Sequence, residues 1–267
     1  MVTQKDMNHE KPDIRNCDCM DLMREFPDNH FDLAIVDPPY GVGSVTYMPC
    51  RREDAHGGHI DRYEVTLATI DMEKQRPFLK SNSCKIVHSG CAKETVKNFG
   101  DFNVAPPPEY FKELFRVSRH QIIWGGNNFL LPPSRCFIVW DKCQSEKFSL
   151  AMAELAWTSF NSVPKIFRKQ SNGTSKYRRI HPTQKPPELY KWLLKLFAKP
   201  GDLILDTHMG SGTSVIAARE FGCHITASEI DHYHYHAALE YIERETQQQE
   251  LSLRADADPQ DEKMTTG

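Results

Sequence analysis

Short apolar runs of strand length alternate with amphipathic helical segments along most of the chain, and no other feature limits its folding so strongly. The run FDLAIV at 31–36 is nearly continuous in apolar character, which is typical of a strand buried on both faces. Further strand-like runs lie at 13–17, 120–126, 136–142, 203–206 and 224–230. Helical patterns occupy 20–25, 106–118, 183–199, 215–222 and 232–246. This order predicts an α/β fold with a doubly wound, mostly parallel sheet, and segment 152–160 predicts an antiparallel strand at its edge.

The length and hydrophobic content of the chain fit one domain of ordinary size. The chain has 267 residues, 39% of them hydrophobic. No apolar run approaches the roughly 20 residues that span a bilayer, and the polar N-terminus lacks a secretory signal, so we expect a soluble cytoplasmic protein without a membrane partner. Residues 1–244 are expected to form this domain, with irregular inserts at 41–104 and 161–180 and a disordered acidic tail at 245–267.

Charge and cysteine content exclude some functions and leave others open. The net charge of −3 does not by itself indicate a nucleic-acid binder, but the stretch 243–263 is strongly acidic and the rest of the chain is close to neutral. The eight cysteines include no C-x-x-C pair and predict neither a disulfide framework nor a common zinc site. His232 and His236 lie one helical turn apart, a spacing that we interpret as a solvated helix face. We therefore expect no metal.

A glycine-rich turn follows the strand-like run at 203–206. The segment Gly210-Ser211-Gly212-Thr213 lies between this run and a helical pattern, where glycines let a ligand approach the backbone and the helix start offers free amides. Glu229 ends the next strand-like run, 17 residues after Gly212, where a carboxylate can accept both hydroxyls of a ribose. Val215 stands where a dinucleotide fingerprint has its third glycine. The pattern indicates a nucleoside-cofactor site without a pyrophosphate cradle, and a purely structural turn is the alternative.

A second motif, Asp37-Pro38-Pro39-Tyr40 (DPPY), directly follows the apolar run 31–36. It resembles the catalytic motif of S-adenosylmethionine-dependent amino-methyltransferases that act on DNA bases. The segment DTHMGSGT at 206–213 resembles their cofactor loop, and HPTQKP at 181–186 resembles the segment just before that loop. The catalytic half comes first here and the cofactor half second, which is the circularly permuted order of the beta class. The resemblance covers most of residues 12–244.

The resemblance implies a seven-stranded Rossmann-like methyltransferase sheet and direct methyl transfer from S-adenosylmethionine to the exocyclic amine of a base in double-stranded DNA. In the chemistry that it implies, the Asp37 carboxylate and the Pro38 carbonyl accept both hydrogens of the amine and so make its nitrogen more nucleophilic. Pro38 and Pro39 stiffen the loop, and Tyr40 stacks on the extruded base. A motif that opens with aspartate favours adenine N6, and cytosine N4 is the nearest alternative.

The matched motifs also suggest residues that bind the cofactor. Asp18 is a candidate acceptor for the adenine amino group of the cofactor, and its alternative role is to cap the following helix. Thr183 and Lys185, at a helix start, are candidates for the methionine carboxylate, or they cap the helix. Asp206 is expected to hold the loop or the methionine ammonium group. Thr207 and His208 replace the usual Pro and Phe of the family, and the flat ring of His208 is expected to pack near the methionine arm.

A basic segment is the main candidate for contact with DNA. Residues 165–179 contain no acidic residue, and glycine, serine and asparagine suggest a flexible loop that can contact phosphates. Its basic residues are Lys165, Arg168, Lys169, Lys176, Arg178 and Arg179. A solvated surface loop is the alternative interpretation. Because no large recognition domain is evident, sequence specificity is expected to depend on short segments such as this one and the insert 41–104.

Several alternatives to a DNA adenine methyltransferase stay open on the sequence. They are a cytosine-N4 DNA methyltransferase, an enzyme that methylates RNA or a protein amide, and a DNA-binding relic that lost its cofactor through Thr207 and His208. The resemblance also allows a homodimer and a cognate restriction endonuclease as partners, as in restriction-modification systems. Binding of the cofactor would separate the relic from the enzymes.

Overall fold

The structure, a computed structural model, describes residues 11–41, 45–53, 59–67, 104–144, 151–170, 180–181 and 183–257. The chain divides into two compact units, and each is described by itself below. The first comprises Met1–Pro38 with Pro107–Gly267, and the second comprises Pro39–Pro106. The described helices of the first unit are α1 (Cys19–Arg24), α2 (Pro108–Val117), α3 (Pro187–Phe197), α4 (Thr213–Phe221) and α5 (His232–Ala257).

An eight-stranded sheet forms the centre of the first unit in the described part of the chain. Its strands lie in the order β1 (Asp13–Arg15), β10 (His224–Ser228), β9 (Leu203–Asp206), β2 (Phe31–Val36), β5 (Ser118–Trp124), β7 (Ala153–Thr158), β6 (Phe137–Asp141) and β8 (Lys165–Arg168). All neighbours pair in parallel except β7, which runs antiparallel to both β5 and β6. The predicted α/β class with a mostly parallel sheet is confirmed.

Two details of the predicted sheet are corrected. The sheet has eight strands where the resemblance implied seven, because β8 adds a strand beside β6. The antiparallel strand was expected at an edge, but β7 lies inside the sheet between β5 and β6. Its residues Ala156, Trp157 and Thr158 are buried, as an internal strand requires. The partly alternating pattern identified the direction of this strand but not its position.

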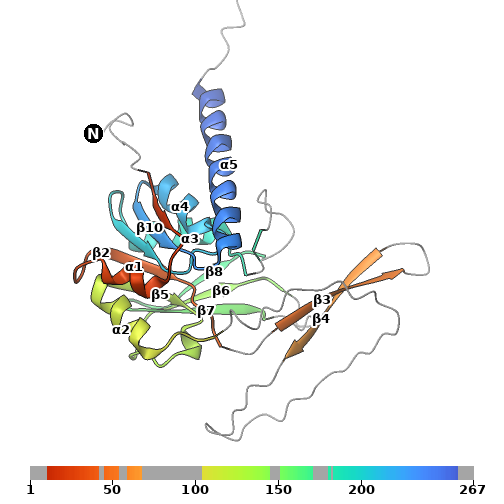
Figure 1. Ribbon diagram of the computed structural model, residues 1–267, viewed down its shortest axis with the longest axis horizontal. Coiled ribbons are helices and arrows are strands. Elements are labelled where there is room, and N and C mark those ends of the chain that lie inside the picture. The colour runs from red at the N-terminus through yellow and green to blue at the C-terminus, as the bar shows by residue number, and fades with distance from the viewer. Residues whose placement is uncertain are drawn as a thin grey trace, which may run out of the picture. The chain divides into compact units, whose positions relative to one another are not determined.

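Helices cover both faces of this sheet (Figure 1). One face packs Leu33 and Ile35 of β2 against α3, α4 and α5, with Leu193 and Val215 in the same cluster. The opposite face packs Ala34 and Val36 against α1 and α2, with contributions from Leu22, Tyr110 and Leu114. Because successive side chains of a strand point to opposite faces, the continuous apolar run 31–36 serves both layers. The fold is therefore doubly wound, as predicted.

The second unit contains a β-hairpin. Strands β3 (Val45–Glu53) and β4 (His59–Leu67) pair antiparallel along their whole length, from Val45 beside Leu67 to Glu53 beside His59. The insert 41–104 was expected to be irregular, and this part of it is not. Gly41 lies at the start of the unit with a φ of +68°, and a Cβ there would come within 2.8 Å of Ala105 Cβ. The outgoing and returning chain therefore pack closely at this glycine.

Two further expectations about loops are corrected. The insert 161–180 contains β8, and its residues 171–179 lie outside the described residues. The tail 245–267 was expected to be disordered, but α5 continues to Ala257. Gln, Glu, Leu, Arg and Ala dominate 247–257, and all of them favour a helix even without an apolar face. Among the described residues, no helix is long and apolar enough to cross a membrane.

Candidate active site

The carboxyl ends of two neighbouring strands carry the aspartates of the two predicted motifs. Strand β2 pairs in parallel with β9, with Leu33 beside Ile204 and Ala34 beside Leu205. Asp37 directly follows β2, and Asp206 is the last residue of β9. Parallel strands end at the same edge of a sheet, where open α/β folds bind their ligands. The fold therefore brings together two segments that are far apart in the sequence.

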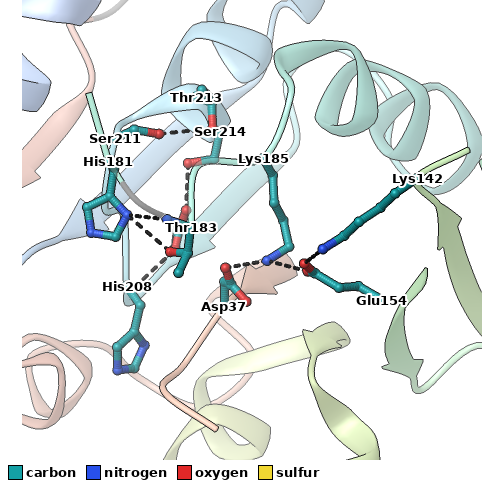
Figure 2. A network of polar contacts seen from close by, with 11 residues as sticks. Asp37, Lys142, Glu154, His181, Thr183, Lys185, His208, Ser211, Thr213 and Ser214 are labelled. Atoms are coloured by element: carbon teal, nitrogen blue, oxygen red, sulfur yellow. Dashed lines mark hydrogen bonds and ion pairs between the residues drawn. The ribbon is translucent and has the colours of Figure 1, made fainter. Parts of the chain in front are cut away.

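A buried lysine holds Asp37. The Lys185 ammonium group contacts Asp37 Oδ2 and lies 3.1 Å from Glu154 Oε2 (Figure 2). Only 3% of the Lys185 side chain is exposed. Burial alone would lower the pKa of Lys185, but the carboxylates of Asp37 and Glu154 raise that pKa above its ordinary value. The structure shows Lys185 on Asp37 of the DPPY motif, and its expected role at the methionine carboxylate stays a prediction.

Asp206 ties the glycine-rich loop to its flanking elements. The carboxylate is buried and accepts a hydrogen bond from Ser214 Oγ at 2.5 Å and from the His208 backbone N–H at 3.0 Å. Burial raises the pKa of Asp206 to about 7, even though both hydrogen bonds favour its ionised form. This carboxylate holds the loop, which is one of the two roles expected for it, and a neighbouring cation would stabilise its ionised form.

The glycine-rich loop has the backbone shape that the sequence predicted. Gly210 and Gly212 have φ angles of +54° and +76°, and Gly212 is the N-cap of α4. A Cβ on Gly212 would lie 2.6 Å from Ile242 Cδ1 of α5. Ser211 and Thr213 are buried beside these glycines, with their hydroxyl oxygens 3.5 Å apart. The loop thus presents close-packed backbone at the start of a helix, where an anionic or polar ligand group is welcome.

Glu229 closes the other side of this loop. It directly follows β10, and its Oε2 accepts a hydrogen bond from the Gly210 N–H at 3.0 Å. Its Oε1 accepts from the Asp231 N–H at the same distance of 3.0 Å. A carboxylate offers about four lone-pair sites, so these two bonds orient the group and leave acceptor capacity for a ligand hydroxyl. Glu229 lies at the tip of β10, and its ribose-binding role stays a prediction.

A hydrogen-bonded chain joins Thr207 and His208 to helix α2. The Tyr110 hydroxyl lies 2.6 Å from Thr207 Oγ1, and Thr207 Oγ1 lies 2.9 Å from His208 Nδ1. The Tyr110 and His208 rings also meet edge to face, with centroids 5.4 Å apart. Burial lowers the pKa of His208 to about 4, so its ring is neutral at neutral pH. Sequence reasoning missed Tyr110, because nothing in an amphipathic helix marks one aromatic residue as a hydrogen-bond partner.

Asp18 and Thr183 occupy positions that serve the local backbone. Asp18 is the N-cap of α1 and accepts a hydrogen bond from the Met20 N–H at 2.7 Å, which matches the alternative role considered for it. Thr183 lies before the start of α3, and its hydroxyl is 3.1 Å from His181 Nδ1. Helix α3 begins after Pro186 without a side-chain cap. Thr183 therefore does not cap that helix, and its predicted role at the cofactor stays a prediction.

The remaining DPPY residues belong to different units of the chain. Pro38 is buried at the end of the first unit, while Pro39 and Tyr40 are half-buried and open the second unit. The predicted roles of these three residues stay predictions. Within the described ranges, no three His, Cys, Asp or Glu side chains are grouped so that they could hold a metal ion.

The predicted basic segment is divided by strand β8. Lys165 begins this strand and borders a cavity of about 560 Å³ that Asp202 and Phe197 also line. Arg168 and Lys169 lie at its other end and pair with Asp141 at 3.4 Å and with Glu188 at 2.8 Å. Strand β8 runs in the same direction as β2. Arg168 and Lys169 therefore lie at the carboxyl ends of the strands, as Asp37 does, and Lys165 lies at the amino end of β8. Lys176, Arg178 and Arg179 lie outside the described residues.

Comparison with known protein families supports the resemblance. A family model described as DNA methylase, covering N6 and N4 modification, matches residues 116–240. This range includes Glu154, Lys185, Asp206 and Glu229, and the DPPY motif precedes it. The type II methyltransferase M2.MboI of Moraxella bovis is 27% identical over 221 residues, which are 74% of this chain and 76% of that protein. These matches support an S-adenosylmethionine-dependent DNA methyltransferase and do not distinguish adenine N6 from cytosine N4.

Two further comparisons agree with this family and fold. The type II methyltransferase M.HinfI of Haemophilus influenzae is 23% identical over 233 residues, which are 77% of this chain and 61% of that protein. Among solved structures, the PvuII DNA methyltransferase (cytosine-N4-specific) superposes with a TM-score of 0.51 at 12% identity, covering 86% of each chain. At that identity the structural likeness concerns the fold alone.

Proposed function

We propose that this chain is an N6/N4 DNA methylase and transfers a methyl group from S-adenosylmethionine to the N6 amine of an adenine extruded from double-stranded DNA. The proposal depends most on one observation: Asp37 and the glycine-rich loop meet at adjoining strand ends of one sheet. A methyl acceptor at one strand end and a methyl donor at the next would be held within reach of each other. The aspartate that opens DPPY favours adenine over cytosine.

The residues present fit S-adenosylmethionine. The cofactor needs a carboxylate for its ribose hydroxyls, a glycine backbone that allows close approach, and a negative environment for its cationic end. Glu229 directly after β10, the loop that contains Gly210 and Gly212, and Asp206 at the end of β9 supply these features at adjacent strand ends. When bound, the cofactor supplies an electrophilic methyl group on a sulfonium. We propose that Asp206 contributes negative charge near the methionine ammonium group, in addition to holding the loop.

The catalytic role of Asp37 is to prepare the nitrogen of the base. The exocyclic amine is a weak nucleophile because its lone pair is delocalised into the ring. We propose that the Asp37 carboxylate and the Pro38 carbonyl accept its two hydrogens, which favours a tetrahedral nitrogen with a localised lone pair. Tyr40 offers an aromatic face for the base, and Pro39 fixes the loop between them. Positioning and electrostatics then supply the rate, without a covalent enzyme intermediate.

Transfer of a labelled methyl group tests the reaction and its target together. DNA is incubated with the chain and methyl-labelled cofactor, digested to nucleosides, and the labelled nucleoside is identified. We expect N6-methyladenine. Label in N4-methylcytosine would support a DNA methyltransferase but show that its target is cytosine N4 and not adenine N6. Label in RNA or protein alone, or no label beside normal cofactor binding, would refute the proposal.

The substitution Asp37→Ala tests the assigned catalytic role. We expect transfer to fall by a factor of about 1,000 or more, because the acceptor of the amine hydrogen is lost. The dissociation constant for S-adenosylmethionine, measured by calorimetry, should change by less than about threefold, since Asp206, the glycine-rich loop and Glu229 lie at the ends of β9 and β10. The control is Asp141→Ala, which removes a carboxylate near the same sheet edge. Retained transfer in Asp37→Ala would contradict the role.

Contact with DNA is proposed for the basic residues at the sheet edge of Asp37. Arg168 ends strand β8 there and Lys169 directly follows it, and further along the chain come Lys176, Arg178 and Arg179. Binding through phosphates predicts an affinity for duplex DNA that falls steeply as salt rises. We also propose a homodimer and a cognate restriction endonuclease as partners, which sedimentation analysis and a cleavage-protection assay would test.

A further inference from the structure

Three charged side chains from three further segments form, together with Asp37, a row of four charges in which Lys185 is buried and the others are half-buried. Lys142 follows β6, Glu154 belongs to β7, Lys185 precedes α3 and Asp37 follows β2 (Figure 2). Lys142 Nζ lies 2.5 Å from Glu154 Oε1, Glu154 Oε2 lies 3.1 Å from Lys185 Nζ, and Lys185 Nζ contacts Asp37 Oδ2. The exposed fractions of these side chains are 14%, 22%, 3% and 16% in that order.

The charges alternate along the row, which explains how they tolerate burial. An isolated buried ion would neutralise, but each member here has an opposite charge beside it. Burial tends to raise the pKa of Glu154, yet Lys185 and Lys142 together lower it to about 2. Glu154 is therefore an anion at neutral pH, beside the cation of Lys185. Only Asp37 and Lys185 belong to motifs that indicated function, so Glu154 and Lys142 have no assigned role.

The contacts of Lys185 show what Glu154 does. The ammonium group lies between two carboxylates, and it also sits 5.1 Å from the centre of the Trp124 ring. Its contact with Glu154 is an ion pair at 3.1 Å, so Glu154 attracts part of the lysine charge away from Asp37. Without Glu154, the lysine charge would act on Asp37 alone. A cation bound more tightly to Asp37 competes with the amine of the base for the same carboxylate.

We propose that Glu154, anchored by Lys142, is a positioning residue that divides the charge of Lys185 between two carboxylates and so keeps Asp37 oriented and able to accept the substrate amine. This role depends on the proposed methyl transfer. Glu154 and Lys142 act on Asp37 through Lys185. Glu154 does not itself touch the reacting atoms in this assignment. Lys142 fixes the other oxygen of Glu154 and sets its direction.

The titratable groups around Lys185 define a test that needs no turnover. They are Asp37 from the end of β2, Glu154 and Lys142 from the antiparallel part of the sheet, and Tyr190 of α3 with Asp206 of β9 close by. Both carboxylates beside Lys185 raise its pKa, and burial opposes them. Removal of one negative charge should therefore lower the titration midpoint of Lys185. Removal of the like charge of Lys142 should not lower it.

The experiment follows Lys185 in the full chain by NMR with lysine labelled at Cε, assigned by Lys185→Arg. We expect Glu154→Gln, a variant of the same size, to lower the midpoint of Lys185 by about one pH unit or more. Lys142→Gln should leave the midpoint unchanged or raise it. The matched control is Glu220→Gln, since Glu220 pairs with Lys191 between α3 and α4 and its side chain has a similar exposure of 25%. An unchanged titration midpoint of Lys185 in Glu154→Gln would contradict the proposal that Glu154 shares the charge of Lys185.

Turnover then tests the positioning role. We expect kcat of Glu154→Gln to fall about 10- to 100-fold while KM for the cofactor changes by less than about threefold, and the alkaline limb of its kcat–pH profile to move down with the NMR midpoint. A kcat equal to that of Glu220→Gln, or a limb that does not move, would overturn the role. A wild-type chain that methylates no DNA overturns the proposed function and with it the positioning role, while the NMR midpoints still decide whether the charge row exists.

Discussion

At the scale of single residues, Thr207 and His208 are the clearest departure from the family pattern, and the structure gives their physical reason. A proline at 207 would have no hydroxyl, whereas Thr207 Oγ1 lies within hydrogen-bond distance of both Tyr110 and His208. Tyr110 is almost wholly buried, so its hydroxyl needs this partner. The three residues form one hydrogen-bonded unit, and the two substitutions are consistent with each other. This consistency argues against a relic that lost its cofactor loop by decay.

The substitution Tyr110→Phe tests that unit. We expect it to lower the free energy of unfolding by about 1–2 kcal/mol, because the buried Thr207 hydroxyl loses a partner. Urea unfolding followed by tryptophan fluorescence measures this loss. The control is Tyr235→Phe, whose half-buried hydroxyl donates to the Ile14 carbonyl over a longer distance of 3.3 Å, and which should lose less. Equal losses in both variants would argue against a special role for the buried chain.

At the scale of elements, the junction between the glycine-rich loop and α5 holds the cofactor side of the site together. Gly212 begins α4 while Ile242 and Ala238 of α5 press against it, so a side chain there meets both strain and crowding. Helix α4 in turn reaches Asp206 through Ser214. A change in this one glycine therefore alters the position of the loop relative to both helices.

The substitution Gly212→Ala should be more damaging than an alanine at a strained but open position. We expect it to lower the free energy of unfolding by about 2–4 kcal/mol and to weaken cofactor binding about tenfold or more. The control is Gly201→Ala, where φ is +89° but nothing lies within 4 Å of the new Cβ. Backbone strain is therefore the only destabilising effect that we expect in this variant. Denaturant unfolding and calorimetry measure both variants. Equal effects would show that crowding by α5 is unimportant.

The sequence predicted elements whose pattern is local and missed those that depend on partners elsewhere. The run at β2, the glycine turn and the helix at α3 carry their signals within a few residues. Strand β8 has only four residues, and its pairing with β6 cannot be seen in its own pattern. The site followed the same rule: motifs located Asp37, Asp206 and Glu229. Glu154 is a single acid in an apolar strand, and only the sheet order shows that it faces Lys185.

At the scale of the whole molecule, the buried Asp206 and the half-buried His208 at the end of β9 give opposite contributions to the pH dependence of stability. The folded chain keeps the pKa of His208 at about 4, below its ordinary 6.5, so acidification between these values protonates only the unfolded chain and lowers the free energy of unfolding. The pKa of Asp206 is raised from 3.8 to about 7, so a rise in pH between these values ionises the unfolded chain first and also lowers that free energy. The two slopes oppose each other across the same pH range.

Single substitutions should reveal the contribution of each group to the pH dependence of the unfolding free energy. Lost contacts cost the same at both pH values, so a comparison between the two values cancels that cost. Relative to wild type, His208→Phe should gain up to about 2 kcal/mol of unfolding free energy at pH 5 compared with pH 8, because its acid-dependent loss disappears. Asp206→Asn should show the reverse, a relative gain at pH 8 compared with pH 5, since the cost of ionising a buried carboxyl is removed. Urea unfolding at both pH values measures these differences. A loosened loop would shift both variants in the same direction. Shifts of the same sign would therefore contradict the assignment of the two slopes to His208 and Asp206. Opposite signs would identify burial at this strand end as their common cause.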